Sequence, residues 1–145
     1  KVHYEIYSTP PILIIHLKRF KANNKIDTFI DYPVNDLDMG KYIIGPKKHE
    51  NNKYDLFAVA HHYGGMGGGH YVASAKNPFN NKWYNFNDSS VSSDREDSVV
   101  ASSGYVLFYR HQNVKELVKF DEIYNKKFIN YEEDIAKLEE KSLNK

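Results

Sequence analysis

The chain of 145 residues is 41% hydrophobic and 27% charged, which predicts a globular domain rather than a disordered segment. Its formal net charge of +1 gives no reason to expect a nucleic-acid partner or a membrane surface, and no apolar run is long enough to cross a bilayer. The sequence has no cysteine, which excludes disulfides and thiolate metal sites within it, and we expect no cofactor.

The first part of the chain predicts strands separated by polar turns. The run Ile12–Phe20 predicts a strand whose apolar first half is buried on both faces. Asn23-Asn24 predicts a turn. Residues 28–34 predict a weaker strand that is interrupted by a proline, and residues 45–52 predict a polar loop.

The middle of the chain predicts a series of strands over residues 54–62, 70–76, 83–88 and 105–109. A glycine loop, 64–69, separates the first two of these strands. The segment 89–103 is rich in Ser and Asp and predicts an exposed loop. An aromatic content of 14% also favours a sheet-rich core, and we expect the sheet to be antiparallel.

The pattern changes after Gln112. Apolar residues then recur every seven positions, at Leu117, Tyr124, Tyr131 and Leu138. This stripe predicts an amphipathic helix that docks on the sheet or on another domain, or forms a short coiled coil. We therefore expect an α+β fold with two parts, residues 1–112 and a helical extension over 113–145. The absence of an initial methionine leads us to expect a fragment.

The candidate chemistry lies in a histidine after the glycine loop and an Asn-Asp pair at the end of the next strand. If Lys76 faces Trp83 across the intervening loop, His70 and Asn87 share one face as diagonal neighbours. Asp88 then points to the other face, although a one-residue slip exchanges the two roles. An imidazole oriented by a side-chain oxygen can serve as the base for a nucleophile.

Three blocks of the sequence resemble the C-terminal half of the catalytic domain of ubiquitin-specific proteases, which are papain-like cysteine proteases. These blocks are 11–20 with Leu17-Lys18-Arg19-Phe20, 54–75 with Gly68-Gly69-His70-Tyr71, and 83–91 with 104–109. The resemblance covers roughly residues 1–112. Asp36-Leu37-Asp38-Met39 and the run 62–70 are similar to the subgroup that carries an N-terminal DUSP domain.

The resemblance implies a thiol-dependent deubiquitinase that cleaves the bond after the C-terminal Gly-Gly of ubiquitin. It implies His70 as the catalytic base, Asn87 as its orienting partner and Asp88 as a neighbouring acid that assists. It also implies a substrate-binding loop and its flank, made of Gly64, Gly65, Gly67, Gly68, Gly69 and Tyr71.

The same resemblance implies ubiquitin and ubiquitinated proteins as partners, and a location in the cytoplasm or nucleus. The nucleophilic cysteine and a zinc-bearing region would lie on an upstream segment that this sequence does not include. Two other functions remain open at this point. The chain could be a non-catalytic ubiquitin-binding or scaffold module, or a metal hydrolase that uses His61, His62 and His70. We interpret His61 and His62 as structural, with one at the core edge and one toward the loop.

Overall fold

A computed structural model describes residues 2–22 and 24–117 of the chain. The chain divides into two units, Lys1–Gln112 and Asn113–Lys145. In the second unit the structure describes one short helix, α1 (Val114–Leu117). The rest of the amphipathic helix predicted after Gln112 lies outside the described residues and stays a prediction.

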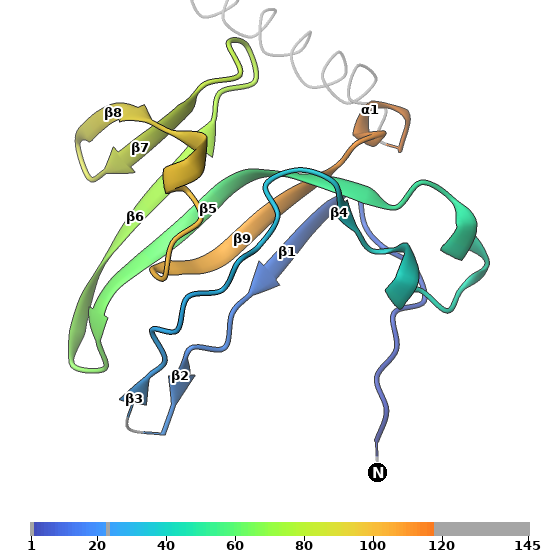
Figure 1. Cartoon of the computed structure of the whole chain (residues 1–145), viewed down its shortest axis with the longest axis horizontal. Coiled ribbons are helices and arrows are strands. Elements are labelled where there is room, and N and C mark those ends of the chain that lie inside the picture. Colours follow the sequence, from blue (N-terminus) through green and yellow to red (C-terminus); the bar gives the residue numbers. More distant parts are fainter. Residues whose placement is uncertain (1, 23, 118–145) are drawn as a thin grey trace, which may run out of the picture. The chain divides into compact units, whose positions relative to one another are not determined.

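The first unit is built on an antiparallel sheet of seven strands, in agreement with the predicted sheet-rich fold (Figure 1). The strand order is β1-β9-β5-β6-β7-β8, and β4 pairs with one end of β5. The strands are β1 (Ile12–His16), β4 (Leu37–Asp38), β5 (Lys53–Gly65), β6 (Gly68–Lys76), β7 (Trp83–Asn87), β8 (Ser90–Asp94) and β9 (Gly104–His111).

A separate two-stranded sheet, β2 (Phe20–Lys21) and β3 (Asn24–Lys25), forms at the predicted asparagine turn. The described residues also form short 3₁₀ helices, η1 (Gly40–Tyr42), η2 (Pro46–His49) and η3 (Glu96–Ser98).

The core lies mainly between the central strands β5 and β9 and the segments that cross them. Its buried residues are Tyr32, Met39, Tyr54, Leu56, Val59, Trp83, Val99, Leu107 and Tyr109. Two tyrosine hydroxyls form hydrogen bonds that hold the segments around residues 32–33 and 99 against the core. Tyr32 donates a hydrogen bond to the carbonyl oxygen of Val99 at 2.6 Å, and Tyr109 donates to that of Pro33 at 2.7 Å. Burial raises the pKa of both tyrosines, which remain neutral donors.

The first strand is shorter and more exposed than predicted. It ends at His16, and Ile14 is 58% exposed, so the prediction of burial on both faces is wrong. The reason is that β1 pairs with β9 in an antiparallel sheet, and only one face of β1 packs against the core. Such a strand buries only alternate side chains, here Leu13 and Ile15.

Residues 28–34, predicted as a weak strand, do not form a strand in the structure. Backbone carbonyl oxygens in and beside this segment accept hydrogen bonds from the Arg19 side chain and from a single backbone N–H, and they do not pair with a neighbouring strand. Arg19 Nη1 donates to the carbonyl oxygens of Ile26 and Thr28, at 2.9 and 2.8 Å, and Leu56 N donates to that of Val34 at 2.8 Å. The segment is therefore held by side-chain and single backbone contacts.

The Ser- and Asp-rich segment 89–103, predicted as an exposed loop, contains β8 and η3, and this prediction is wrong. Strand β8 pairs with β7 along its whole length, while its side chains stay mostly exposed. Val99, just after η3, is fully buried in the core. The polar composition correctly predicted that most side chains of β8 are exposed. It gave no sign that the backbone of β8 pairs with β7.

Candidate active site

The predicted register of the β6–β7 hairpin is confirmed, because Lys76 pairs with Trp83. This register brings the end of β7 beside the start of β6. There, His70 Nε2 lies 2.6 Å from Asn87 Oδ1, which is a hydrogen bond between two side chains from the same face of the sheet. The contact predicted between these two residues from strand arithmetic is present in the structure.

The contact defines which nitrogen of His70 is available. The amide oxygen of Asn87 can only accept, so His70 Nε2 must carry the hydrogen and donate it. In a neutral imidazole the other nitrogen, Nδ1, then holds a lone pair. The His70 side chain is 47% exposed, so a reacting group can approach that lone pair.

Asp88 also comes close to His70, although the sequence placed it on the opposite face. Its Oδ2 lies 3.9 Å from His70 Nε2, which is too far for a hydrogen bond but close enough for electrostatic attraction to an imidazolium. Asp88 lies outside the strand, in the turn between β7 and β8, with φ of 50°. This turn carries the carboxylate toward the same ring nitrogen that Asn87 contacts.

The predicted glycine loop is instead the end of a β-hairpin. Gly64 pairs with Gly69 and Gly65 with Gly68, so only Met66 and Gly67 form the turn. The prediction of a long loop is therefore wrong, because backbone pairing continues through residues that have no side chains to signal a strand.

Two of these glycines are required by the hairpin itself. Gly64 has φ of 95°, a conformation that disfavours other residues. A Cβ on Gly69 would lie 2.3 Å from His62 Nε2, which is a clash. By contrast, a Cβ on Gly65, Gly67 or Gly68 would meet nothing within 4 Å. The latter three leave open space beside the strand, where another chain could approach the backbone closely.

Tyr71 does not lie beside His70. Adjacent residues of a strand point to opposite faces, and Tyr71 packs against His62, with ring centroids 4.8 Å apart. The Tyr71 side chain is nevertheless exposed. Any substrate contact by Tyr71 would therefore come from the face of β6 opposite to the imidazole.

His61 and His62 are both buried and lie on opposite faces of β5. His61 makes two side-chain contacts, from Nδ1 to Ser103 Oγ at 3.0 Å and from Nε2 to Ser74 Oγ at 3.2 Å. Burial lowers the pKa of His61, and the negative charge of Asp94 partly offsets this effect. Sequence reasoning missed the two serines and Asp94, because isolated Ser and Asp residues give no signal of buried pairing.

The lowered pKa of His61 predicts a pH-dependent stability. An unfolded histidine binds a proton below about pH 6.5, whereas buried His61 does not until lower pH. Acidification below about pH 6.5 should therefore reduce the free energy of unfolding. Urea unfolding at about pH 7.5 and about pH 5.5 measures the difference, and His61→Gln should make it smaller. An unchanged difference in His61→Gln would contradict the assignment of this pH dependence to His61.

Among the described residues, no group of three or more His, Cys, Asp and Glu side chains is placed to hold a metal ion. Within the same residues, no helix combines the length and apolarity needed to cross a membrane.

Several known proteins are similar to this chain. A family model described as ubiquitin carboxyl-terminal hydrolase matches residues 1–109. The chain is 50% identical over 113 residues to ubiquitin carboxyl-terminal hydrolase 15 of Homo sapiens, covering 75% of this chain and 11% of that protein. It is 42% identical over 142 residues to ubiquitin carboxyl-terminal hydrolase 12 of Saccharomyces cerevisiae, covering 92% of this chain and 11% of the relative.

Solved structures of DUB modules also contain chains that are similar to this one. The SAGA Ubp8/Sgf11/Sus1/Sgf73 DUB module bound to ubiquitin aldehyde contains a chain that is similar with a TM-score of 0.64 and 34% identity. The match covers 73% of this chain and 25% of that one. The described chain thus spans about a quarter of a related chain of known structure and about a ninth of the two curated relatives named above.

Proposed function

Because the chain belongs to the ubiquitin carboxyl-terminal hydrolase family, we propose that it supplies the histidine half of a cysteine-protease site that acts on ubiquitin. In this proposal a cysteine from a segment outside this sequence completes the site, since the chain contains none. The substrate is a ubiquitinated protein inside the cell, and the scissile bond follows the C-terminal Gly-Gly of ubiquitin.

The contact between His70 Nε2 and Asn87 Oδ1 is the observation that carries the proposal. It leaves Nδ1 of His70 to accept the proton of the incoming thiol, so that the thiolate attacks the carbonyl carbon of the terminal glycine. His70 then protonates the leaving amine, which departs from the tetrahedral intermediate and leaves a thioester on the cysteine. His70 next takes a proton from water, whose oxygen attacks the thioester and regenerates the thiol.

Asn87 and Asp88 have different roles in this mechanism. Asn87 accepts the Nε2 hydrogen and so selects the tautomer and orients the ring. Asp88, at 3.9 Å from the same nitrogen, adds attraction for the imidazolium without a hydrogen bond.

The division of the site between two segments predicts that the 145-residue chain alone hydrolyses no ubiquitin–fluorophore substrate, because it has no thiol to form the acyl-enzyme. A longer form that includes the upstream segment should hydrolyse it, and replacement of the upstream cysteine by serine should abolish turnover. Appreciable turnover by the 145-residue chain would contradict the split site. Ubiquitin binding without turnover by the longer form would favour the alternative, a non-catalytic ubiquitin-binding module.

The open glycines predict where the ubiquitin tail lies. If the tail runs along the hairpin, Gly68→Ala should raise KM several-fold while the melting temperature stays unchanged, because the new methyl group fills space that the tail needs. Gly69→Ala is the matched comparison. It should lower the melting temperature, because its methyl group clashes with His62 whether or not substrate is bound. An unchanged KM in Gly68→Ala would remove the hairpin from the tail-binding site.

A further inference from the structure

A row of hydrogen bonds, buried except at its Asp94 end, crosses the sheet near His70 and has no part in the mechanism above. Ser74 Oγ donates to Asp94 Oδ2 at 2.6 Å, and His61 lies between Ser74 and Ser103, at 3.2 and 3.0 Å. Ser74, His61 and Ser103 are all buried. The row therefore links β8, β6, β5 and the turn before β9 through side chains alone. These four residues are named the buried relay below.

The donors of the relay have one consistent direction. The carboxylate of Asp94 can only accept, so the Ser74 hydroxyl gives its hydrogen to Asp94. The Ser74 oxygen must then accept from His61, which requires a hydrogen on His61 Nε2. The remaining nitrogen, Nδ1, accepts from the Ser103 hydroxyl. A neutral imidazole with its hydrogen on Nε2 satisfies every member, in agreement with its lowered pKa.

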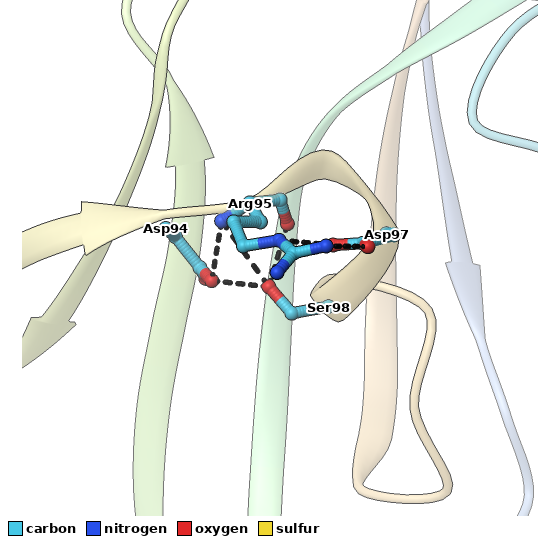
Figure 2. Close-up of polar contacts among 4 residues, drawn as sticks. All are labelled: Asp94, Arg95, Asp97 and Ser98. Carbon is cyan, nitrogen blue, oxygen red and sulfur yellow. Dashed lines mark hydrogen bonds and ion pairs between the residues drawn. The ribbon is translucent and has the colours of Figure 1, made fainter.

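Asp94 is itself fixed in place at the junction of β8 and η3, as Figure 2 shows. Its Oδ1 accepts hydrogen bonds from the Ser98 hydroxyl and from the backbone N–H of Arg95, the latter at 2.8 Å. Burial raises the pKa of Asp94, but the hydrogen bonds from Ser74, Ser98 and the Arg95 backbone outweigh this effect and hold the pKa below its usual value. The two carboxylate oxygens thus have separate partners, with Oδ1 bonded within η3 and Oδ2 bonded to the relay.

The bond between Ser74 and Asp94 also constrains the shape of the sheet. Strand β7 lies between β6 and β8, so their backbones are about 10 Å apart in a flat sheet, at about 4.8 Å for each step. Side chains only two or three bonds long meet across that distance when the sheet curls toward them. The 2.6 Å contact therefore accompanies a curl of β6, β7 and β8 toward the face that carries His70.

That curl acts on the strands that hold the candidate site. Ser74 lies four residues after His70 on β6, with its side chain on the same face. On the other side, Ser90 of β8 pairs with Asn87, and β8 ends at Asp94. The relay thus ties together the strand that carries His70 and the strand that pairs with the one carrying Asn87.

We propose that the buried relay Asp94–Ser74–His61–Ser103 is a positioning device, which holds the curl of β6 to β8 and thereby the approach of Asn87 to His70. His61 is the positioning residue of the device, because it joins the β6–β8 clamp to β5 and to the turn before β9. This role in catalysis rests on the proposed function, whereas the hydrogen-bond direction within the relay does not.

Nitrogen-15 NMR of the histidine rings in the complete protein tests the direction of the relay. The wild-type protein should show His61 with its hydrogen on Nε2. In Asp94→Asn, the amide oxygen should keep the place of Oδ1 beside Ser98 and Arg95, so that the NH₂ group faces Ser74 and donates to it. The Ser74 hydroxyl would then turn to His61 Nε2, and the ring hydrogen should move to Nδ1. A hydrogen on Nδ1 in the wild type, or no change in Asp94→Asn, would overturn the relay whatever the activity of the protein.

Kinetics of the complete enzyme test the positioning role. His61→Phe should lower kcat at least about 10-fold with KM within about 2-fold, because His70 is less well aligned while the ubiquitin surface is intact. His61→Gln, whose amide can still donate to Ser74, should recover at least half of the lost kcat on a logarithmic scale. His111→Phe is the control, since His111 is also buried and bonded, to the Asn51 carbonyl oxygen at 2.8 Å, near the opposite end of β9.

His111→Phe should lower the melting temperature as His61→Phe does, yet leave kcat within about 2-fold of wild type. If His61→Phe does not fold, Ser74→Ala takes its place in the comparison. An equal loss of kcat in His61→Phe and His111→Phe, or no recovery in His61→Gln, would reduce the relay to a stabilising contact. If Asp94→Asn leaves the His61 tautomer unchanged while the wild-type enzyme hydrolyses the ubiquitin substrate, the relay is wrong and the proposed function stands. If the tautomer changes as expected but the wild-type enzyme is inactive, the proposed function is wrong and the relay stands.

Discussion

Replacement of His70 by alanine in the complete enzyme should remove nearly all hydrolysis of a ubiquitin–fluorophore substrate. The lone pair on Nδ1 has no substitute at this position, and a positioned base contributes roughly 10²–10⁴-fold to such reactions. In the proposed mechanism the imidazole acts on the thiol and the leaving amine, so affinity for ubiquitin should stay within a few fold. Steady-state kinetics gives kcat, and binding of ubiquitin to the inactive variant gives Kd.

His49→Ala is a suitable control for this experiment, since His49 is an exposed histidine on η2. It should retain wild-type kcat. Retention of more than about a tenth of the wild-type kcat by His70→Ala would require another base and would withdraw His70 from the mechanism.

The second large effect separates Asn87 from Asp88. Asn87→Ala should lower kcat by about 10-fold to 10²-fold, which corresponds to the loss of a hydrogen bond to a charged group of about 1.5–3 kcal/mol. Asp88→Ala should lower it less, because its carboxylate is 82% exposed and lies 3.9 Å from the ring nitrogen. Parallel measurement of kcat and melting temperature for the two variants decides the order, and a larger loss in Asp88→Ala would exchange the roles.

Asn87→Asp gives the matching conservative change. The carboxylate can accept the same hydrogen from Nε2, so substantial activity should remain. Its negative charge also stabilises the imidazolium that forms when His70 takes the thiol proton, so Asn87→Asp should keep a higher kcat than Asn87→Ala. A kcat of Asn87→Asp no higher than that of Asn87→Ala would contradict direct contact between residue 87 and the imidazolium.

The contact between His70 and Asn87 could be predicted from the sequence because strand geometry is periodic. Once Lys76 faces Trp83, the pairing of all the remaining residues in the β6–β7 hairpin follows. Side chains two residues apart then share a face. The alternation of side chains along a strand could not predict the position of Asp88 in the same way. This residue lies in a turn with φ of 50°, where strand periodicity no longer applies, and the turn brings its carboxylate within 3.9 Å of the imidazole.

The glycine hairpin and β8 escaped sequence reasoning for a related reason. Strands are recognised by their apolar side chains, whereas the ladder itself is formed by the backbone. The glycines that pair in the hairpin, Gly64, Gly65, Gly68 and Gly69, have no side chains to give a pattern, and β8 carries mainly serines. Both segments form strands because a neighbouring strand offers them hydrogen-bond partners, which is information from the fold and not from the segment.

From the sequence alone we could predict where most of the main strands lie along the chain, the family, and the histidine and asparagine that meet in the candidate site. Local periodicity and motif spacing carry this information, since each depends on residues close together in the chain. Three facts became evident from the three-dimensional structure alone: Ile14 is exposed, Gly69 makes room for His62, and Asp94 reaches Ser74 across an intervening strand. Those facts depend on which face of the sheet is covered, on which strands are neighbours and on how far the sheet curls, and all three are set by packing between segments distant in the sequence.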